Sequence, residues 1–290
     1  MKSILIVGTA RNVSNKIVSQ IVWIREIMAT DFDIEFFVVE SDSSDDTVVK
    51  LDYLSQKYTN FKYETLGPIA EKIPSRIQRL RFCRNRYVEF IRHEAQDRWD
   101  YVIVMDLDGI NRKITRLGLI SCFNQNEEWD ACFPVQKYGY YDLLALRANN
   151  WSMSDPIHEM RVLVENERAK TVYSSAIGKI LLYIKIDRIR KKYFYSKMLK
   201  FSGQTKLIPV LSAFGGIGIY RSIIFHEADY GHLESTEGCE HVDLNLRATQ
   251  LGYKLVINTS FINSHWNSYN LNRMLLVRLY RMTGFSFRRH

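Results

Sequence analysis

Three short apolar runs, each followed by a polar segment, constrain the fold of this 290-residue chain more than any other feature. They lie at residues 4–8 (ILIVG), 35–39 (EFFVV) and 101–105 (YVIVM), with longer segments of helical spacing between them. Short runs of this kind are typical of strands buried on both faces. Their alternation with helices predicts an α/β fold with a largely parallel central sheet.

The residue spacing predicts further elements around these runs. Apolar residues at steps of three and four predict a helix over 13–30. We expect other helices at 45–57, 73–97, 179–200, 242–251 and 270–282, and strands at 129–134 and 254–258. The stretch 136–178 is rich in aromatic and turn residues, so we expect loops and short elements there.

The composition excludes several classes of protein. Four cysteines without a CxxC pair do not make a disulfide framework, which favours a reduced, cytoplasmic protein. No window approaches 18 uninterrupted apolar residues, so we expect no transmembrane helix. The first apolar run is too short for a signal peptide. The motifs of standard dinucleotide, P-loop, zinc-protease and nucleophile-elbow sites do not occur.

Polar segments follow the three apolar runs, at 8–12, 40–46 and 106–109. The carboxyl ends of parallel strands meet at one edge of a sheet, where α/β proteins bind their ligands. Asp106 and Asp108 stand two residues apart at such an end and can share a divalent cation. Oxygen ligands favour Mg²⁺ or Mn²⁺. A solvated turn is the alternative reading of this pair.

The order and spacing of these segments resemble the nucleotide-sugar glycosyltransferases of the GT-A fold. The matching segments are ILIVGTARN, FFVVESDSSDDT, RFCRNRY, VIVMDLDG, WDACFPVQKYGYYDLLALR, SAFGGIGIYR, CEHVDLNLRATQLGY and NTSFINSHW. The pattern is similar to bacterial capsule and cell-surface glycosyltransferases related to the fungal capsule-associated α-1,3-mannosyltransferases. It implies a GT-A domain over 1–267, with a donor-binding part to about residue 110, an acceptor part over 111–267, and a basic amphipathic segment over 268–290.

The resemblance implies a metal-dependent enzyme of surface polysaccharide synthesis. It would move a sugar from a GDP- or UDP-sugar to a hydroxyl of a glycan or lipid-linked acceptor, with retention suggested by the mannosyltransferase kinship. A bound Mn²⁺ or Mg²⁺ would act as a Lewis acid on the departing diphosphate. Asp106, Asp108 and His265 match the metal ligands of the family.

The resemblance also assigns the remaining site residues. Donor binding falls to Thr9, Ala10, Arg11, Glu40, Asp42, Arg84, Asp106, Gly215 and Gly216. Acceptor binding falls to Tyr141, Asp142, Arg147 and His241. Glu240, and after it Asp243, match the acidic position near the acceptor hydroxyl, as a base in an inverting reaction or an orienting group in a retaining one. We expect Asp45 and Asp46 to cap the helix that follows them.

Two other function classes stay open. A nucleotidyltransferase acting on sugar phosphates would share the sheet and the metal-binding carboxylates, but it usually has a first loop rich in glycine and basic residues. Residues 8–12 hold one Gly and one Arg. A nucleic-acid-binding protein would use the net charge of +8 and the pI of about 9.2.

The distribution of charge speaks against nucleic acid. Residues 179–200 have a net charge of +7 and residues 273–290 one of +5, which leaves −4 for the rest. Basic segments that also hold apolar residues suit an anionic membrane surface, and solvated helix faces are the alternative. We expect a cytoplasmic enzyme bound peripherally at the inner face of the cell membrane.

Overall fold

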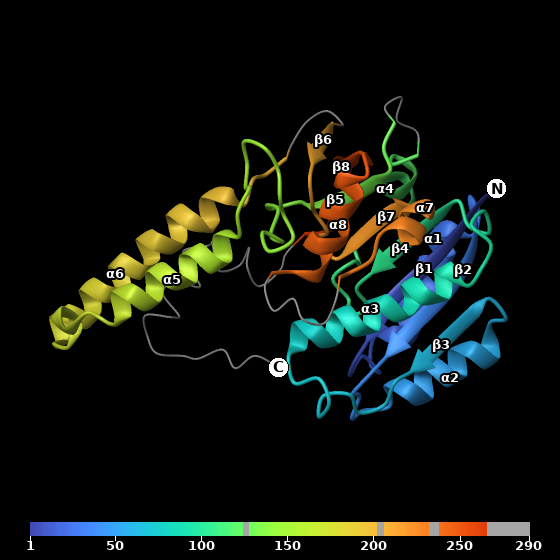
Figure 1. The fold of residues 1–290 in the computed structure, drawn as a ribbon, viewed down its shortest axis with the longest axis horizontal. Coiled ribbons are helices and arrows are strands. Elements are labelled where there is room, and N and C mark those ends of the chain that lie inside the picture. The colour runs from blue at the N-terminus through green and yellow to red at the C-terminus, as the bar shows by residue number, and fades with distance from the viewer. Residues whose placement is uncertain (124–127, 202–205, 232–237, 266–290) are drawn as a thin grey trace.

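The computed structural model describes residues 1–123, 128–201, 206–231 and 238–265, and their centre is one mixed sheet (Figure 1). Its strands are β1 (Lys2–Ala10), β2 (Phe32–Glu40), β3 (Phe61–Thr65), β4 (Tyr101–Met105), β5 (Ala131–Gln136), β6 (Leu207–Val210), β7 (Ile217–Arg221) and β8 (Leu255–Ser264). Their order across the sheet is β3-β2-β1-β4-β7-β5-β8-β6.

Parallel pairing dominates this sheet. The pairs β1–β2, β2–β3, β1–β4 and β5–β8 are parallel. Strand β7 runs antiparallel between β4 and β5, and β6 runs antiparallel beside β8. The predicted α/β fold with a mainly parallel central sheet is therefore confirmed.

Each face of the sheet carries its own apolar cluster. Along β1, Leu5 and Val7 belong to one cluster, and Ile4 and Ile6 belong to the other. Successive side chains of a strand point to opposite faces, so a strand covered on both sides needs an apolar residue at every position. This is the physical reason for the uninterrupted apolar runs in the sequence.

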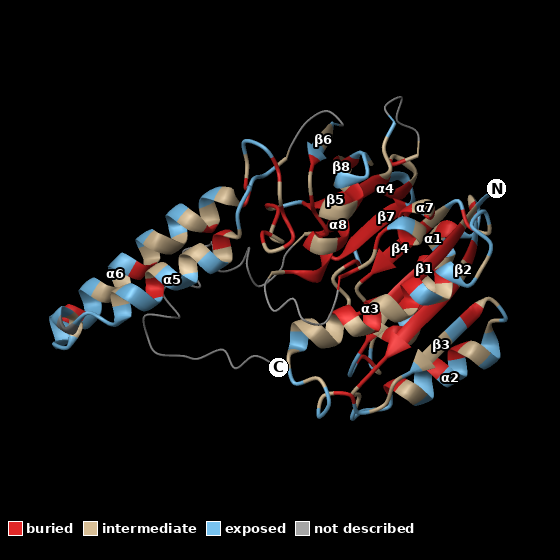
Figure 2. Cartoon of the chain, in the orientation of Figure 1, coloured by how far each residue is buried: buried red, intermediate tan, exposed pale blue. Residues whose placement is uncertain are grey.

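Helices cover both faces of the sheet, and Figure 2 shows the strands buried between them. The helices of the sheet domain are α1 (Ile17–Met28), α2 (Thr47–Lys57), α3 (Arg76–Arg92), α4 (Arg116–Ile120), α7 (Ile223–Glu227) and α8 (Glu240–Gln250). Helices α1, α2 and α4 join the cluster of Ile4, and α3, α7 and α8 join the cluster of Leu5. The helices expected at 13–30, 45–57, 73–97 and 242–251 are confirmed, with ends shifted by a few residues. The helix expected at 270–282 and the segment 268–290 lie outside the described residues.

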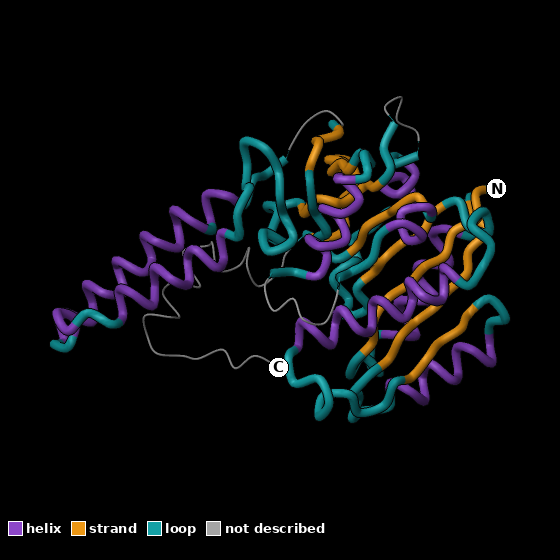
Figure 3. Tube along the Cα trace, viewed as in Figure 1, coloured by secondary structure: helices purple, strands orange, loops and turns teal. Residues whose placement is uncertain are grey.

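Two further helices form a hairpin that projects from the sheet domain (Figure 3). They are α5 (Pro156–Arg168) and α6 (Ala176–Tyr193), and α6 confirms the helix expected at 179–200. Helix α5 corrects the expectation of short elements over 136–178. Asp155 caps it by accepting hydrogen bonds from the backbone N–H groups of Ile157 (2.8 Å) and His158 (3.1 Å). Within the described ranges, no helix has both the length and the hydropathy to cross a bilayer.

Candidate active site

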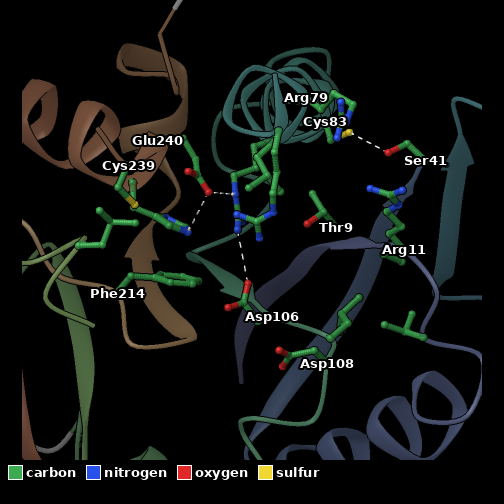
Figure 4. Close-up of a pocket in the computed structure, with 18 of the residues that line it drawn as sticks. Thr9, Arg11, Ser41, Arg79, Cys83, Asp106, Asp108, Phe214, Cys239 and Glu240 are labelled. Carbon is green, nitrogen blue, oxygen red and sulfur yellow. Dashed lines mark hydrogen bonds and ion pairs between the residues drawn. The ribbon is translucent and has the colours of Figure 1, made fainter. Parts of the chain in front are cut away.

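A pocket of about 440 Å³ lies at the carboxyl ends of β1, β2 and β4. In Figure 4, Glu240 and Phe214 lie on one side of it, Thr9 and Arg11 lie on the other, and Asp106 and Asp108 lie below. The predicted site residues that line it are Thr9, Ala10, Arg11, Asp42, Arg84, Asp106, Asp108, Tyr141, Asp142, Glu240 and His241. Segments far apart in the sequence are thus brought to one cavity, at the edge of the sheet that the motifs indicated.

Arg84 lies at the centre of the pocket's polar contacts. Its Nε donates to Glu240 Oε1 at 3.1 Å, and its Nη2 lies 3.4 Å from Asp106 Oδ1. The guanidinium also lies 5.6 Å from the ring centroid of Phe214, and the side chain is only 4% exposed. Burial alone would lower the pKa of Arg84, but the oxygens of Tyr87, Glu240 and Asp106 raise it well above its ordinary value. Arg84 therefore joins α3 to the end of β4 and the start of α8.

The carboxylates of the pocket repel one another. Burial raises the pKa of Asp106, Arg84 opposes this, and the nearby carboxylates of Asp108, Asp142 and Glu240 add to it, so that the pKa is about 7. Burial likewise raises the pKa of Asp142. Asp106 and Asp108 directly follow β4 and both line the cavity, together with the buried Leu107 between them. The carboxylates of Asp106 and Asp108 are oxygen ligands of the kind that a hard divalent cation such as Mg²⁺ or Mn²⁺ prefers.

His265 is not brought into this set. It follows β8 and packs edge-on against Tyr138, with 6.2 Å between ring centroids. Desolvation and then Lys137 and Lys113 lower its pKa. In the described part of the chain, no three His, Cys, Asp or Glu side chains are grouped so that they could hold a metal ion. Of the three predicted metal ligands, the pocket thus contains two, Asp106 and Asp108.

Glu40 is not among the residues that line the pocket, and its carboxylate binds neighbouring parts of the chain. It is 1% exposed and accepts hydrogen bonds from the Ser43 backbone N–H (2.9 Å) and the Thr65 hydroxyl (2.5 Å). The interpretation of Glu40 as a direct contact to the donor is therefore corrected: its carboxylate holds the loop after β2 against β3.

Asp42 does line the pocket, and its backbone is unusual. Its φ of 55° lies in the left-handed region. Its Oδ1 accepts from the backbone N–H of Ala70 at 2.8 Å, and Arg11 Nε donates to its carbonyl at 3.3 Å. These contacts join the loops after β1, β2 and β3 into one rim.

Asp45 fastens the same rim, as its predicted capping role requires. It accepts from the backbone N–H groups of Thr47 (3.0 Å) and Ser14 (3.1 Å). Desolvation acts to raise its pKa, but hydrogen bonds from the side chains of Thr47 and Ser14, and then from their backbone N–H groups, outweigh it and lower the pKa to about 2. Asp46, the residue directly before α2, makes no side-chain cap hydrogen bond. The capping prediction is confirmed for Asp45 and wrong for Asp46.

Gly215 and Gly216 form backbone hydrogen bonds to two acidic residues of the pocket, Asp142 and Asp106. Their φ values are 74° and 100°, which favour glycine. The Gly215 N–H donates to Asp142 Oδ2 at 2.8 Å, and the Gly216 carbonyl accepts from the Asp106 N–H at 2.9 Å. A Cβ on Gly216 would lie 2.7 Å from a methyl carbon of Ile110. These glycines position two carboxylates and are not among the residues that line the cavity.

His241 lines the pocket next to Glu240. Its ring stacks on Phe214 with 3.5 Å between centroids, and the residue is 3% exposed. Neither ring nitrogen has a hydrogen-bond partner among the described residues. Burial, followed by the charge of Arg84, holds the pKa of His241 well below its ordinary value. The pocket therefore contains a neutral imidazole with free hydrogen-bonding capacity.

Two other predicted residues make contacts of their own outside the pocket. Arg147 donates from Nη1 to the carbonyls of Leu144 (3.1 Å) and Leu146 (2.7 Å), so its side chain stabilises a loop. Asp243 forms an ion pair with the buried Arg81. Asp243 is therefore a structural partner of α3 in this arrangement, and the cavity lining includes Glu240 and not Asp243.

Sequence reasoning missed two basic residues of the wall. Arg76 and Arg79 line the pocket beside Arg84. Positions 76, 80 and 84 are separated by steps of four, and 76 and 79 by a step of three, which places them on one side of α3. This spacing was the signal that would have identified them.

No model of a protein family matches the sequence, and no curated protein matches it. Similar solved structures include Staphylococcus aureus TarS residues 1–349, with 12% identity, a TM-score of 0.44, and coverage of 89% of this chain and 58% of that one. The mannosyltransferase PcManGT from Pyrobaculum calidifontis, in complex with GDP-Man and Mn²⁺, has 11% identity, a TM-score of 0.47, and coverage of 98% and 64%.

A third similar structure is glucosyl-3-phosphoglycerate synthase from Mycobacterium tuberculosis, in complex with Mn²⁺, UDP and phosphoglyceric acid. It has 13% identity, a TM-score of 0.44, and coverage of 98% of this chain and 80% of that one. The chain spans about three fifths of the length of the first two structures. Matches at this level show what the chain is similar to and do not assign its activity.

Proposed function

We propose that this chain is a GT-A glycosyltransferase that transfers a sugar from a nucleoside-diphosphate sugar to an acceptor hydroxyl with the help of a divalent metal ion. One observation supports this most: Asp106 and Asp108 share a single pocket with Arg11, Arg79 and Arg84 at the ends of β1, β2 and β4. A diphosphate needs cationic contacts, and its metal ion needs carboxylates. The pocket offers both kinds of group.

Asp106 and Asp108 are the residues that would hold the ion. When bound, Mn²⁺ or Mg²⁺ supplies Lewis-acid stabilisation of the charge that develops on the leaving diphosphate. The arginines of α3 add fixed positive charge on the same wall, and the rim of Thr9, Arg11 and Asp42 borders the place for the nucleotide.

Glu240 suits an orienting role better than that of a free base. Its carboxylate accepts a charge-assisted hydrogen bond from Arg84, and its side chain is only 8% exposed. Removing a proton from an acceptor would require it to compete with that ion pair. This geometry supports a retaining reaction, in which no protein base has to deprotonate an acceptor hydroxyl that attacks from the face opposite the leaving diphosphate.

Asp142 and His241 supply the acceptor side. Asp142 has a raised pKa and therefore a more basic carboxylate; burial lowers the pKa of His241, whose Nε2 lies 3.9 Å from Glu240 Oε1 and whose ring nitrogens make no hydrogen bond to the described residues. These groups can hold sugar hydroxyls by accepting and donating hydrogen bonds. The likeness of the sequence motifs to capsule and cell-surface glycosyltransferases supports a glycan or lipid-linked acceptor in surface polysaccharide synthesis.

A donor screen tests the proposal. Thermal shift and sugar release are measured with UDP-, GDP- and CMP-sugars, with and without Mn²⁺. We expect one class of nucleoside-diphosphate sugar to raise the melting temperature in the presence of metal, and Asp108→Ala to abolish that shift. Asp33→Ala, at an exposed position of β2 outside the pocket, is the matched control and should retain it. If no diphosphate nucleotide stabilises the protein, the donor site is wrongly assigned; salt-sensitive retention of RNA or DNA would then favour a nucleic-acid-binding protein.

A further inference from the structure

The hairpin of α5 and α6 exposes an apolar surface. Four large side chains of α6 form it, and we call them the tip patch: Ile177, Ile180, Leu181 and Ile184, with 72%, 62%, 53% and 42% exposure. Their spacing of three, four and seven residues places them on one face of the helix. The opposite face holds the buried Ile186, and α6 packs along α5. Helix α6 is thus apolar on two sides, of which α5 covers one.

Basic residues continue the same side of α6 toward the sheet domain. We call them the basic collar: Lys185, Arg188, Lys191 and Lys192, all exposed. Helix α6 as a whole has six Lys or Arg residues and one acid, Asp187, which pairs with Lys191 at 2.8 Å. The tip patch lies in the half of α6 that follows the turn, at the end of the hairpin farthest from the sheet (Figure 1). On the face of α6 that carries the tip patch, apolar and basic groups are therefore separated along the helix axis, while Lys179 lies on another side of the helix.

We propose that this hairpin binds the enzyme to a membrane that contains anionic lipids, with the tip patch inserted and the basic collar against the headgroups. From Ile177 to Ile184 the helix rises about 10 Å, at about 1.5 Å per residue. Interfacial helices bury their apolar face to a depth of about 5–10 Å, so the patch matches that layer. Lys and Arg beside it are attracted to the negative surface potential of anionic lipids.

The charges favour a lipid surface over a second copy of the chain. A dimer that paired two hairpins in the same direction would bring the two basic collars together, and the opposite direction would place each collar on an apolar patch. A membrane offers hydrocarbon to the patch and negative charge to the collar at the same time. The proposal does not depend on the donor site, because the hairpin residues lie outside the pocket.

Co-sedimentation of the full chain with vesicles tests the proposal. Vesicles of phosphatidylcholine alone are compared with vesicles that also contain phosphatidylglycerol, and no nucleotide is added. We expect pelleting with the anionic vesicles, and a loss of at least about tenfold in partitioning when the tip patch becomes Ile177→Ser/Ile180→Ser/Leu181→Ser/Ile184→Ser. The matched control Val49→Ser/Leu117→Ser/Leu251→Ser removes exposed apolar side chains of the sheet domain and should bind like wild type.

The collar is tested separately. Lys185→Glu/Arg188→Glu/Lys192→Glu should remove the preference for anionic vesicles, by about tenfold or more. Wild type that stays in the supernatant, or a tip variant that pellets like wild type, would overturn the proposal. So would light scattering that shows a dimer which the tip variant dissociates, with no pelleting, since the patch would then bind a second copy.

A labelled single-residue variant gives a readout that does not rely on four simultaneous changes. The four native cysteines are buried, so Ile180→Cys places one accessible thiol for an environment-sensitive dye. We expect the fluorescence emission of the dye to shift to shorter wavelength when anionic vesicles are added, and we expect no such shift for a dye attached at Val49→Cys. Equal behaviour of the two labelled proteins would also contradict insertion of the tip.

Discussion

Replacing Arg84 with methionine tests the electrostatic centre of the pocket. Methionine keeps most of the length of the side chain and removes the charge. Glu240, with 8% side-chain exposure, would lose its cation, and so would Asp106, with 35%. Both carboxylates would then stand near Asp142 and Asp108 with no positive group between them.

The size of the effect follows from the burial of these partners. Removing one member of a buried ion pair costs about 3–5 kcal/mol, because the other charge is left uncompensated. Asp106 is half-buried and keeps some water, so we take the lower part of that range, about 3–4 kcal/mol. In a chain of this size, about 2 °C of melting temperature corresponds to each kcal/mol, so Arg84→Met should melt about 6–8 °C below wild type.

Chemical and thermal denaturation measure this difference, and a neighbour on the same helix is the control. Arg86 is 36% exposed and pairs with Glu64 at 2.8 Å. Its replacement by methionine should cost only about 0–1 kcal/mol, as exposed pairs do. The double variant Arg84→Met/Glu240→Gln should recover part of the loss, since one unpaired charge is gone. An Arg84→Met protein as stable as Arg86→Met would refute the central role of this ion pair.

Three further changes test other parts of the structure. Burial lowers the pKa of His241, so as the pH falls the histidine is protonated in the unfolded chain before it is protonated in the folded one. The free energy of unfolding of wild type should therefore fall as the pH drops below about 6.5. His241→Phe should reduce this loss, measured as the difference between denaturation at pH 7.5 and at pH 5. Asp45→Ala loses two backbone hydrogen bonds, including that of Ser14, and should cost about 1 kcal/mol near pH 7 by urea unfolding. Because the pKa of Asp45 is lowered, this difference should shrink as the pH falls from about 4 toward 2. Gly8→Ala would place a Cβ 2.5 Å from the Met105 carbonyl and should cost about 1–3 kcal/mol or prevent soluble expression, whereas an unchanged melting temperature would contradict this packing.

The strands buried on both faces were predictable, because burial requires apolar residues at every position. The strands of the second half were harder. In β7, Gly218 weakens the strand signal, yet a Cβ there would lie 2.9 Å from the ring of Phe133. The pairing of β7 between β4 and β5 depends on contacts between residues that are more than 80 positions apart in the sequence, which local spacing does not encode. Helix α5 had a readable start in Asp155-Pro156, but the aromatic residues around it favoured loops.

The site divides in a similar way. Asp106, Asp108, Arg84 and Glu240 were predicted and lie in one pocket. The position of the two aspartates could be predicted because they directly follow a buried strand, at the edge of the sheet where ligands bind. The role of Glu40 depended on strand register. Its carboxylate accepts a hydrogen bond from the Thr65 hydroxyl because Glu40 of β2 lies directly beside Thr65 of β3. The sequence alone does not show whether a carboxylate at the end of a strand faces a ligand or a neighbouring strand.

The position of β7 has a consequence for synthesis of the chain. Strands β4 and β5 are both complete by Gln136, but the strand that separates and joins them begins only at Ile217. A ribosome adding about 5–20 residues per second needs roughly 4–16 s for the intervening segment of about 80 residues. During that interval the edges of β4 and β5 that pair with β7 lack their hydrogen-bond partner, although both strands have apolar faces. One of them, β4, ends directly before Asp106 and Asp108. We therefore expect the nascent chain to be most prone to aggregation, and most in need of a chaperone, between those two points of translation.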